Sequence, residues 1–341
     1  MKKSLCSLAL ASAITTGAFA APEAPAMKIN DFSPIPPAPK AAEGSAPRIL
    51  QWQDGKKAVF FMAFDDGCVS QLDNAIPLMQ KYGAIGTFYP IIDAGFFKGQ
   101  IKRWEALVDD PHVVFGNHTL THGDFPDAAK FESEVQAAEE ALHKMTPKAK
   151  WPRLMSFGQP GVKVWNVSKE DFKATLARHN LIDRPPFLGA SINVTTIPQA
   201  EKLVDDALAS GGMSHLDFHG VGGDWLAPPT EFFEGLLKKL LAEKDKVWQT
   251  SAIDYHKYAT ERDASKIEVV KQSPLSVALK LTSTTDPALY DLPLTIEAEV
   301  PAAWKKCHVV AEGLKPVDVE VVQGRVRFYA LPGAIALTRG M

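Results

Sequence analysis

Between residues 58 and 250 the chain alternates short apolar runs with longer segments of helical periodicity. The apolar runs, each taken as a strand, cover residues 58–64, 85–91, 113–116, 154–157, 187–192, 213–219 and 246–250. The helical segments between them include residues 131–144, 169–179, 198–209 and 231–243. Strands that are apolar throughout belong in a parallel sheet covered on both faces, so the pattern predicts an α/β fold. Seven such units indicate a barrel over residues 51–263.

The pattern changes beyond about residue 264. Short alternating strands are predicted at residues 276–282, 294–300, 308–311 and 325–330, and Pro and Gly turns separate them. This alternation indicates a small β-rich C-terminal domain over residues 264–341.

The first 50 residues lack the strand and helix patterns of both predicted domains. Two lysines follow Met1, an apolar run covers residues 5–16, and Ala18-Phe19-Ala20 resembles a cleavage site, so residues 1–20 are expected to be a signal peptide. A signal peptide predicts an exported protein, periplasmic or secreted. The apolar run is too short to cross a bilayer, so no membrane span is expected. Seven prolines between residues 21 and 47 predict that residues 21–50 form an extended linker or arm.

Composition narrows the choice of partners. The chain has 341 residues, is 46% hydrophobic and carries a formal net charge of −3, so it has material for a core but no polycationic surface for nucleic acid. Cys68 and Cys307 remain after removal of the leader, and they are expected to be free thiols rather than a disulfide framework. The oligomeric state stays open.

Two polar motifs follow predicted strands. Asp65-Asp66-Gly67 ends the first strand, and His118 and His122 follow the third. Without a function, Asp-Asp-Gly would be an ordinary turn sequence and the two histidines would be ordinary surface residues. However, the carboxyl ends of barrel strands share one mouth, and histidines four apart would share one face of a helical turn. A carboxylate and two imidazoles that meet there would suit a divalent metal, with zinc favoured, and would leave a coordination position open.

These motifs resemble those of a known family. Ala63-Phe64-Asp65-Asp66-Gly67 is similar to the T-F-D-D-G motif, and residues 116–122, Gly-Asn-His-Thr-Leu-Thr-His, are similar to the N-H-T/S-x-x-H motif of the polysaccharide deacetylases, the NodB-homology group of carbohydrate esterase family four. Residues 216–219, Leu-Asp-Phe-His, look like a late strand of that family that ends in His. The resemblance covers about residues 56–262 and implies an irregular (β/α)7 barrel.

The resemblance also implies roles for particular residues. Asp66, His118 and His122 match the metal triad, Asp65 matches the general base that deprotonates the attacking water, and His219 matches the general acid that protonates the leaving group. A backbone N–H near Gln159 to Gly161 is expected to help stabilise the tetrahedral oxyanion.

Two supporting motifs of the family depart from the pattern. The third contains an Arg that steadies the base, but the expected loop, residues 157–161, has none. Arg184-Pro185-Pro186-Phe187 resembles that motif by letters and is interpreted as a coincidental turn, although Arg153 or Arg184 could replace the guanidinium in space.

The fourth motif is expected near residues 191–193, but neither its Asp nor its Trp is present there. Asp217 or Asp224 is suggested to orient His219, and Trp225 is suggested to form a wall of the substrate pocket. His215 is interpreted as a structural residue.

The sequence therefore predicts a metal-dependent hydrolase that removes acetyl groups from a carbohydrate, first among them the N-acetyl group of a GlcNAc-containing poly- or oligosaccharide. Two alternatives remain. The enzyme could hydrolyse O-acetyl esters on xylan or another glycan, or the barrel could be a carbohydrate-binding protein that has lost catalysis.

Overall fold

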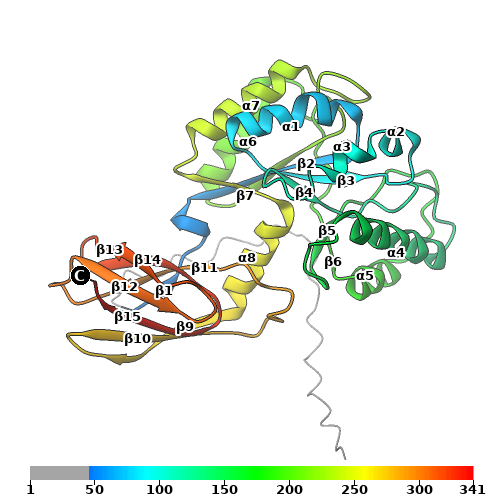
Figure 1. Cartoon of the computed structure of the whole chain (residues 1–341). Coiled ribbons are helices and arrows are strands. Elements are labelled where there is room, and N and C mark those ends of the chain that lie inside the picture. Colours follow the sequence, from blue (N-terminus) through cyan, green and yellow to red (C-terminus); the bar gives the residue numbers. More distant parts are fainter. Residues whose placement is uncertain (1–45, 341) are drawn as a thin grey trace, which may run out of the picture.

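A computed structural model describes residues 46–340 of the chain. The predicted signal peptide and most of the predicted linker lie outside these residues. Figure 1 shows two units side by side, one with a parallel sheet among helices and one made of strands, with helix α8 (Ala252–Ala264) between them. No helix within residues 46–340 is long and apolar enough to cross a bilayer.

The first unit is built on parallel strands. They are β2 (Ala58–Asp66), β3 (Gly86–Pro90), β4 (Val113–Phe115), β5 (Met155–Phe157), β6 (Leu181–Asp183), β7 (Met213–Phe218) and β8 (Val247–Thr250). Hydrogen bonding orders them as β4-β3-β2-β7, with β8 also on β2 and with β5 and β6 as a separate pair. Single bridges link Asn117 to Phe157 and Gly189 to Asp217, so the strands curl into an irregular barrel. The predicted α/β barrel fold is confirmed.

One predicted strand is wrong. Residues 187–192 hold only isolated bridges at Gly189 and Ala190, and the strand of this unit is β6, a few residues earlier. Pro185 and Pro186 follow β6 and have no N–H to donate to a ladder. The N–H of Leu188 is donated to the side chain of Asp217 instead of to a neighbouring strand.

Helices surround this sheet. They are α1 (Ile76–Tyr82), α2 (Gly95–Lys98), α3 (Ile101–Glu105), α4 (Ala128–Met145), α5 (Lys169–Arg178), α6 (Ile197–Ser210) and α7 (Thr230–Ala242), and the turns η1 (Gln53–Gly55) and η2 (Gln71–Ala75) add to them. Three of them, α4, α5 and α6, start where a side chain, that of Asp127, Ser168 and Thr196 in turn, accepts a free N–H, whereas α7 follows Pro229 and has no such cap. In α4, Phe131, Val135 and Leu142 share the spacing of one helix face and lie in the barrel core.

The second unit is a sandwich of two antiparallel sheets. Its strands are β1 (Arg48–Ile49), β9 (Ser265–Gln272), β10 (Ser276–Ser283), β11 (Leu294–Glu299), β12 (Lys306–Ala311), β13 (Val317–Glu320), β14 (Arg325–Ala330) and β15 (Gly333–Arg339). One sheet has the order β1-β11-β14 and the other β13-β12-β15-β10-β9. The strand β1 comes from the end of the segment predicted as a linker, so the chain enters the sandwich before it enters the barrel.

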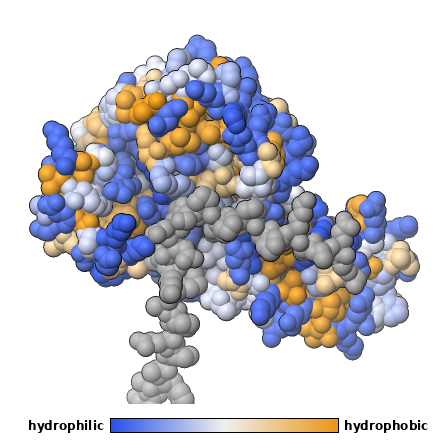
Figure 2. Space-filling view, turned by 180° about the vertical axis from the view of Figure 1, so that it is seen from behind, coloured by the Kyte–Doolittle hydropathy of each residue, from blue (hydrophilic) through white to orange (hydrophobic). Residues whose placement is uncertain are grey.

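The two units share a hydrophobic core. Val59 and Phe61 of the barrel and Tyr258 of α8 belong to the same buried cluster as Leu279 and Ile296 of the sandwich. Cys68 and Cys307 are buried free thiols, as predicted. Seen from behind, the hydrophilic surface is interrupted by separate hydrophobic patches on both units (Figure 2).

Glu261 of α8 provides a test of this shared region. Its side chain is fully buried, and both carboxylate oxygens lack a hydrogen-bond partner among residues 46–340. Burial, with a smaller contribution from the charge of Asp291, raises the pKa of Glu261 from 4.5 to about 7. A carboxyl group with a raised pKa costs nothing below pH 4.5, where both the folded and unfolded states are protonated, and costs most above pH 7.

We therefore expect Glu261→Gln to raise the free energy of unfolding by about 1–3 kcal/mol at pH 8 and to change it little at pH 4.5. Thermal unfolding of both proteins across this pH range measures the difference. Glu268→Gln, on an exposed position of β9, is the matched control and should show no such pH dependence. An equal effect of Glu261→Gln at both pH values would contradict the account.

Candidate metal centre and catalytic site

The acidic pair lies at the carboxyl end of the central strand β2. This strand pairs with β7 over Val59–Phe64 and with β3 over Met62–Asp66, and its side chains are buried from Ala58 to Asp66. Asp66 and Gly67 both adopt left-handed backbone conformations, with φ of 70° and 74°. Asp tolerates this conformation better than most residues, and a Cβ on Gly67 would lie 2.8 Å from the ring of Phe97. The sharp turn therefore suits these two residue types.

The His segment after β4 is a loop, not the helical turn that the spacing suggested. Thr119 and His122 have φ values of 63° and 55°, which no α-helix contains. Asn117 fixes the loop because its Oδ1 accepts the N–H of Thr119 and its Nδ2 donates to the carbonyl of Val135. The buried carboxylate of Glu134 accepts the N–H and hydroxyl of Thr121.

The loop still brings the two imidazoles to Asp66. The Nε2 atoms of His118 and His122 lie 3.4 and 3.8 Å from Oδ1 of Asp66. Three ligands of a tetrahedral zinc ion, each about 2.0–2.1 Å from it, would be about 3.4 Å apart. The three side chains therefore have the spacing of a metal site, and they form a group of His and acidic residues that could hold an ion.

Two further observations fit a cation at this position. Oδ1 of Asp66 is buried and has no hydrogen-bond partner among residues 46–340, which is costly for a carboxylate oxygen without a cation. Nδ1 of His118 lies 2.7 Å from the carbonyl oxygen of Gly158, so this nitrogen carries a proton and Nε2 is the ring atom that faces Asp66 and could serve as the ligand. The donor set of two nitrogens and one oxygen is one that zinc and similar divalent ions accept.

The electrostatics keep these groups in the state that binds a cation. Burial opposes ionisation of Asp66, but the nearby imidazoles of His118 and His219, together with the hydrogen bond from Trp225, outweigh it and lower the pKa of Asp66. Burial and then the neighbouring charge of His118 lower the pKa of His122. The carboxylate is therefore ionised and the His122 ring neutral at physiological pH.

Asp65 has a different partner. Nη1 and Nη2 of Arg184 donate to Oδ1 and Oδ2 of Asp65, each at 2.6 Å, in a pair that is almost completely buried. Burial alone would raise the pKa of Asp65, but the Arg184 guanidinium outweighs it and the pKa is lowered. The guanidinium also lies over the ring of Tyr89, with its carbon 4.8 Å from the ring centre. Asp65 is thus held ionised and in one orientation.

The interpretation of Arg184 as part of a coincidental turn is wrong. It rested on a strand at residues 187–192, which would place Arg184 before a strand and at the far end of the barrel. Because β6 ends at Asp183, Arg184 directly follows a strand and lies at the catalytic end. The letters Arg-Pro-Pro-Phe were the signal that could have identified it.

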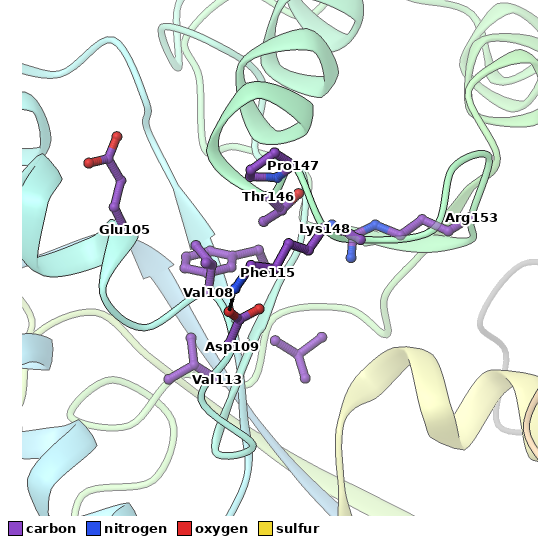
Figure 3. A pocket seen from close by; sticks show the side chains of 11 residues that line it. Glu105, Val108, Asp109, Val113, Phe115, Thr146, Pro147, Lys148 and Arg153 are labelled. Carbon is purple, nitrogen blue, oxygen red and sulfur yellow. Dashed lines mark hydrogen bonds and ion pairs between the residues drawn. The ribbon is translucent and has the colours of Figure 1, made fainter.

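Arg153, the other suggested replacement, lies elsewhere. It lines a cavity of about 380 Å³ that includes Val113 at the start of β4, the opposite end of the strands from the His loop. Figure 3 shows Arg153 beside Lys148 and Thr146 in that cavity. Its guanidinium lies over the ring of Trp151.

The residues suggested to orient His219 have other partners. Asp217 lies 3.5 Å from Arg184 and 3.5 Å from His215, and it accepts the N–H of Leu188. Asp224 accepts the N–H of Ser70. Asp217 therefore extends the Asp65–Arg184 pair into a buried network, a role that the sequence interpretation missed. His215 stacks on Phe61 and is structural, as expected.

His219 follows β7 and faces the acidic pair. Its Nε2 lies 3.8 Å from Oδ2 of Asp66, and its ring meets the edge of Phe187 at 5.5 Å between centres. Trp225 lies on the loop after β7, and its Nε1 donates to Oδ2 of Asp66 at 2.7 Å. Gln159 and Gly161 are exposed on the loop that contributes the carbonyl of Gly158.

Comparisons with known proteins found similarity to one family model and to one curated relative. Residues 53–175 match the family model for polysaccharide deacetylase. The chain is 23% identical over 312 residues to a gellan lyase from a Bacillus species, and the match covers 82% of this chain but only 12% of that protein.

Two solved structures are similar to part of the chain at low sequence identity. A family 4 carbohydrate esterase from Streptomyces lividans in complex with acetate is 15% identical, with 56% of this chain and 91% of that chain covered and a TM-score of 0.41. A peptidoglycan N-acetylglucosamine deacetylase is 14% identical, with 57% and 86% covered and a TM-score of 0.43. The segment that matches the polysaccharide deacetylase model contains Asp65, Asp66, His118 and His122.

Proposed function

We propose that this protein is a metal-dependent hydrolase that removes acetyl groups from a carbohydrate, with the N-acetyl group of a GlcNAc-containing poly- or oligosaccharide as the first candidate. The observation that carries the proposal is a carboxylate held by an arginine, Asp65 with Arg184, directly beside the Asp66, His118 and His122 cluster. The family match and the relative named for its action on gellan support a carbohydrate substrate.

Asp66, His118 and His122 are the residues that would hold the cation, and zinc is the ion we propose. A divalent ion bound there supplies polarisation of the acetyl carbonyl and a lower pKa for water. Asp65 then accepts the proton of the attacking water. Arg184 occupies one lone pair on each oxygen of Asp65, so it orients this base and leaves its other lone pairs for the water.

His219 is placed by its strand end to donate a proton to the leaving amine or alcohol on the other side of Asp66. The backbone N–H groups of Gln159 and Gly161 are the proposed oxyanion donors, since Pro160 between them has none. No residue of this set acts as a nucleophile, so acetate leaves without a covalent acyl-enzyme.

The signal-like residues 1–20 support a protein that acts outside the cytoplasm, in the periplasm or beyond it. The net charge of −3 supports the further proposal that nucleic acid is not a partner. Both stand on sequence features alone.

Acetate release tests the function directly. We expect the purified protein to release acetate from N-acetylated glycans with Zn²⁺ and to lose this activity in a chelator. Activity on O-acetylated xylan alone would instead identify an ester hydrolase. Binding to these glycans without acetate release under any divalent ion would identify a binding protein and overturn the proposal.

Two substitutions separate the base from the ligands. Asp65→Asn should keep bound Zn²⁺ and lose activity by about 10²–10⁴-fold, because it removes the base but no ligand. His118→Ala should lose Zn²⁺ as well as activity. Metal content and acetate release are measured on both variants. Loss of metal in Asp65→Asn, or stoichiometric zinc in His118→Ala, would show that the roles are assigned wrongly.

Arg184→Gln should leave Asp65 as a buried charge without its partner. We expect a loss of about 3–5 kcal/mol in the free energy of unfolding, together with a large loss of acetate release. Urea unfolding gives the first quantity. The matched control is Arg178→Gln, which breaks a bidentate pair with Glu132 on the surface and should change stability little. Equal effects of the two substitutions would contradict the role of Arg184.

A further inference from the structure

The loop between β7 and α7 carries Trp225 into contact with the acidic pair. We propose that Trp225 is a positioning residue for the metal-binding carboxylate: its indole N–H holds Oδ2 of Asp66, so that Oδ1 alone faces the two imidazoles. This inference rests on the proposed function and adds to it a residue that neither the motifs nor the triad includes.

The contacts divide the two oxygens of Asp66 between different partners. Nε1 of Trp225 is 2.7 Å from Oδ2, whereas Oδ1 is the oxygen that lies 3.4 and 3.8 Å from His118 and His122. The indole N–H is a donor only, so Trp225 cannot itself bind a cation. A hydrogen bond to an ionised carboxylate is stronger than one between neutral groups and fixes the rotation of the side chain.

The same contact keeps His219 separate from Asp66. Nε2 of His219 lies 3.8 Å from Oδ2, close enough to become its partner if the carboxylate rotates. With the indole N–H on Oδ2, the carboxylate is held against this rotation, and His219 stays available for the leaving group. Trp225 thus holds one carboxylate between the imidazole pair and the proposed acid.

The loop is built to present the indole in this position. Asp224 accepts the N–H of Ser70 at 2.6 Å, and the Ser70 hydroxyl donates to the carbonyl of Gly223 at 2.9 Å, which ties the loop to the residue that precedes η2. Asp224 and Leu226, on either side of Trp225, have φ values of 62° and 49°. Left-handed conformations at two such residues are unfavourable and persist where surrounding contacts enforce them.

Core packing does not account for the placement of Trp225. The side chain is 38% exposed, and its ring packs edge-on with the ring of Phe96, with 5.1 Å between centres. A ring turned fully inward would remove more apolar surface from water than this one does. The half-exposed ring keeps its N–H on Asp66, which is the feature that a positioning role requires.

The test is the affinity of the metal-free protein for Zn²⁺, measured by competition with a chromophoric chelator. We expect Trp225→Phe, which keeps a ring but removes the donor, to bind Zn²⁺ about 10- to 100-fold more weakly than the unsubstituted protein. Phe96→Leu is the matched control, since it removes the ring packed against Trp225 and leaves the N–H in place, and it should stay within about twofold of the unsubstituted protein.

The outcomes separate this inference from the proposed function. Unchanged affinity in Trp225→Phe, or an equal loss in Phe96→Leu, overturns the positioning role alone. If the unsubstituted protein binds no Zn²⁺, or if the His118→Ala variant binds Zn²⁺ with the same affinity, then the proposed metal centre is wrong and so is the inference about Trp225. Thermal unfolding of the metal-free variants is measured in parallel, and a loss of affinity in a Trp225→Phe protein that unfolds like the unsubstituted chain supports the proposal.

Discussion

Asp65 and Asp66 follow seven consecutive apolar residues of β2 that are all fully buried, so two negative charges stand side by side where the barrel holds little water. An uncompensated carboxylate in such a place costs several kcal/mol. The neighbouring elements each supply compensation. Arg184 comes from the end of β6, the imidazoles come from the loop after β4, and Trp225 comes from the loop after β7.

This constraint explains why the two adjacent residues have different roles. Asp65 uses both oxygens on one guanidinium, which keeps it ionised but leaves it no share in the imidazole cluster. Asp66 has one oxygen on the indole and the other without a partner among the described residues. A left-handed turn at Asp66 separates the directions of the two side chains. The pair therefore places a fixed carboxylate, the proposed base, beside an unpartnered oxygen, the proposed ligand atom, within one dipeptide.

The sequence predicted most of the scaffold because continuous apolar runs and helix periodicity are local properties. It predicted the meeting of Asp66 with His118 and His122, but through a helical turn that does not form, since Asn117 and Glu134 impose a loop. It named Arg184 only as an alternative to Arg153, because a strand was placed six residues too late. The end of the strand at which a residue lies decides whether it reaches the site. The contact of Trp225 with Asp66 depends on the left-handed backbone of Asp224 and Leu226, which the periodicity of hydrophobic residues cannot predict.

The central claim is that the cluster at the mouth of the barrel holds a divalent cation on three side chains. A crystal structure of the Zn²⁺-loaded protein, with anomalous scattering recorded at the zinc edge, tests it most directly. The account predicts one strong anomalous peak about 2.0–2.2 Å from Oδ1 of Asp66 and from Nε2 of His118 and His122. A peak bound by Asp65, or a Zn²⁺-soaked crystal with no peak at these atoms, would contradict it.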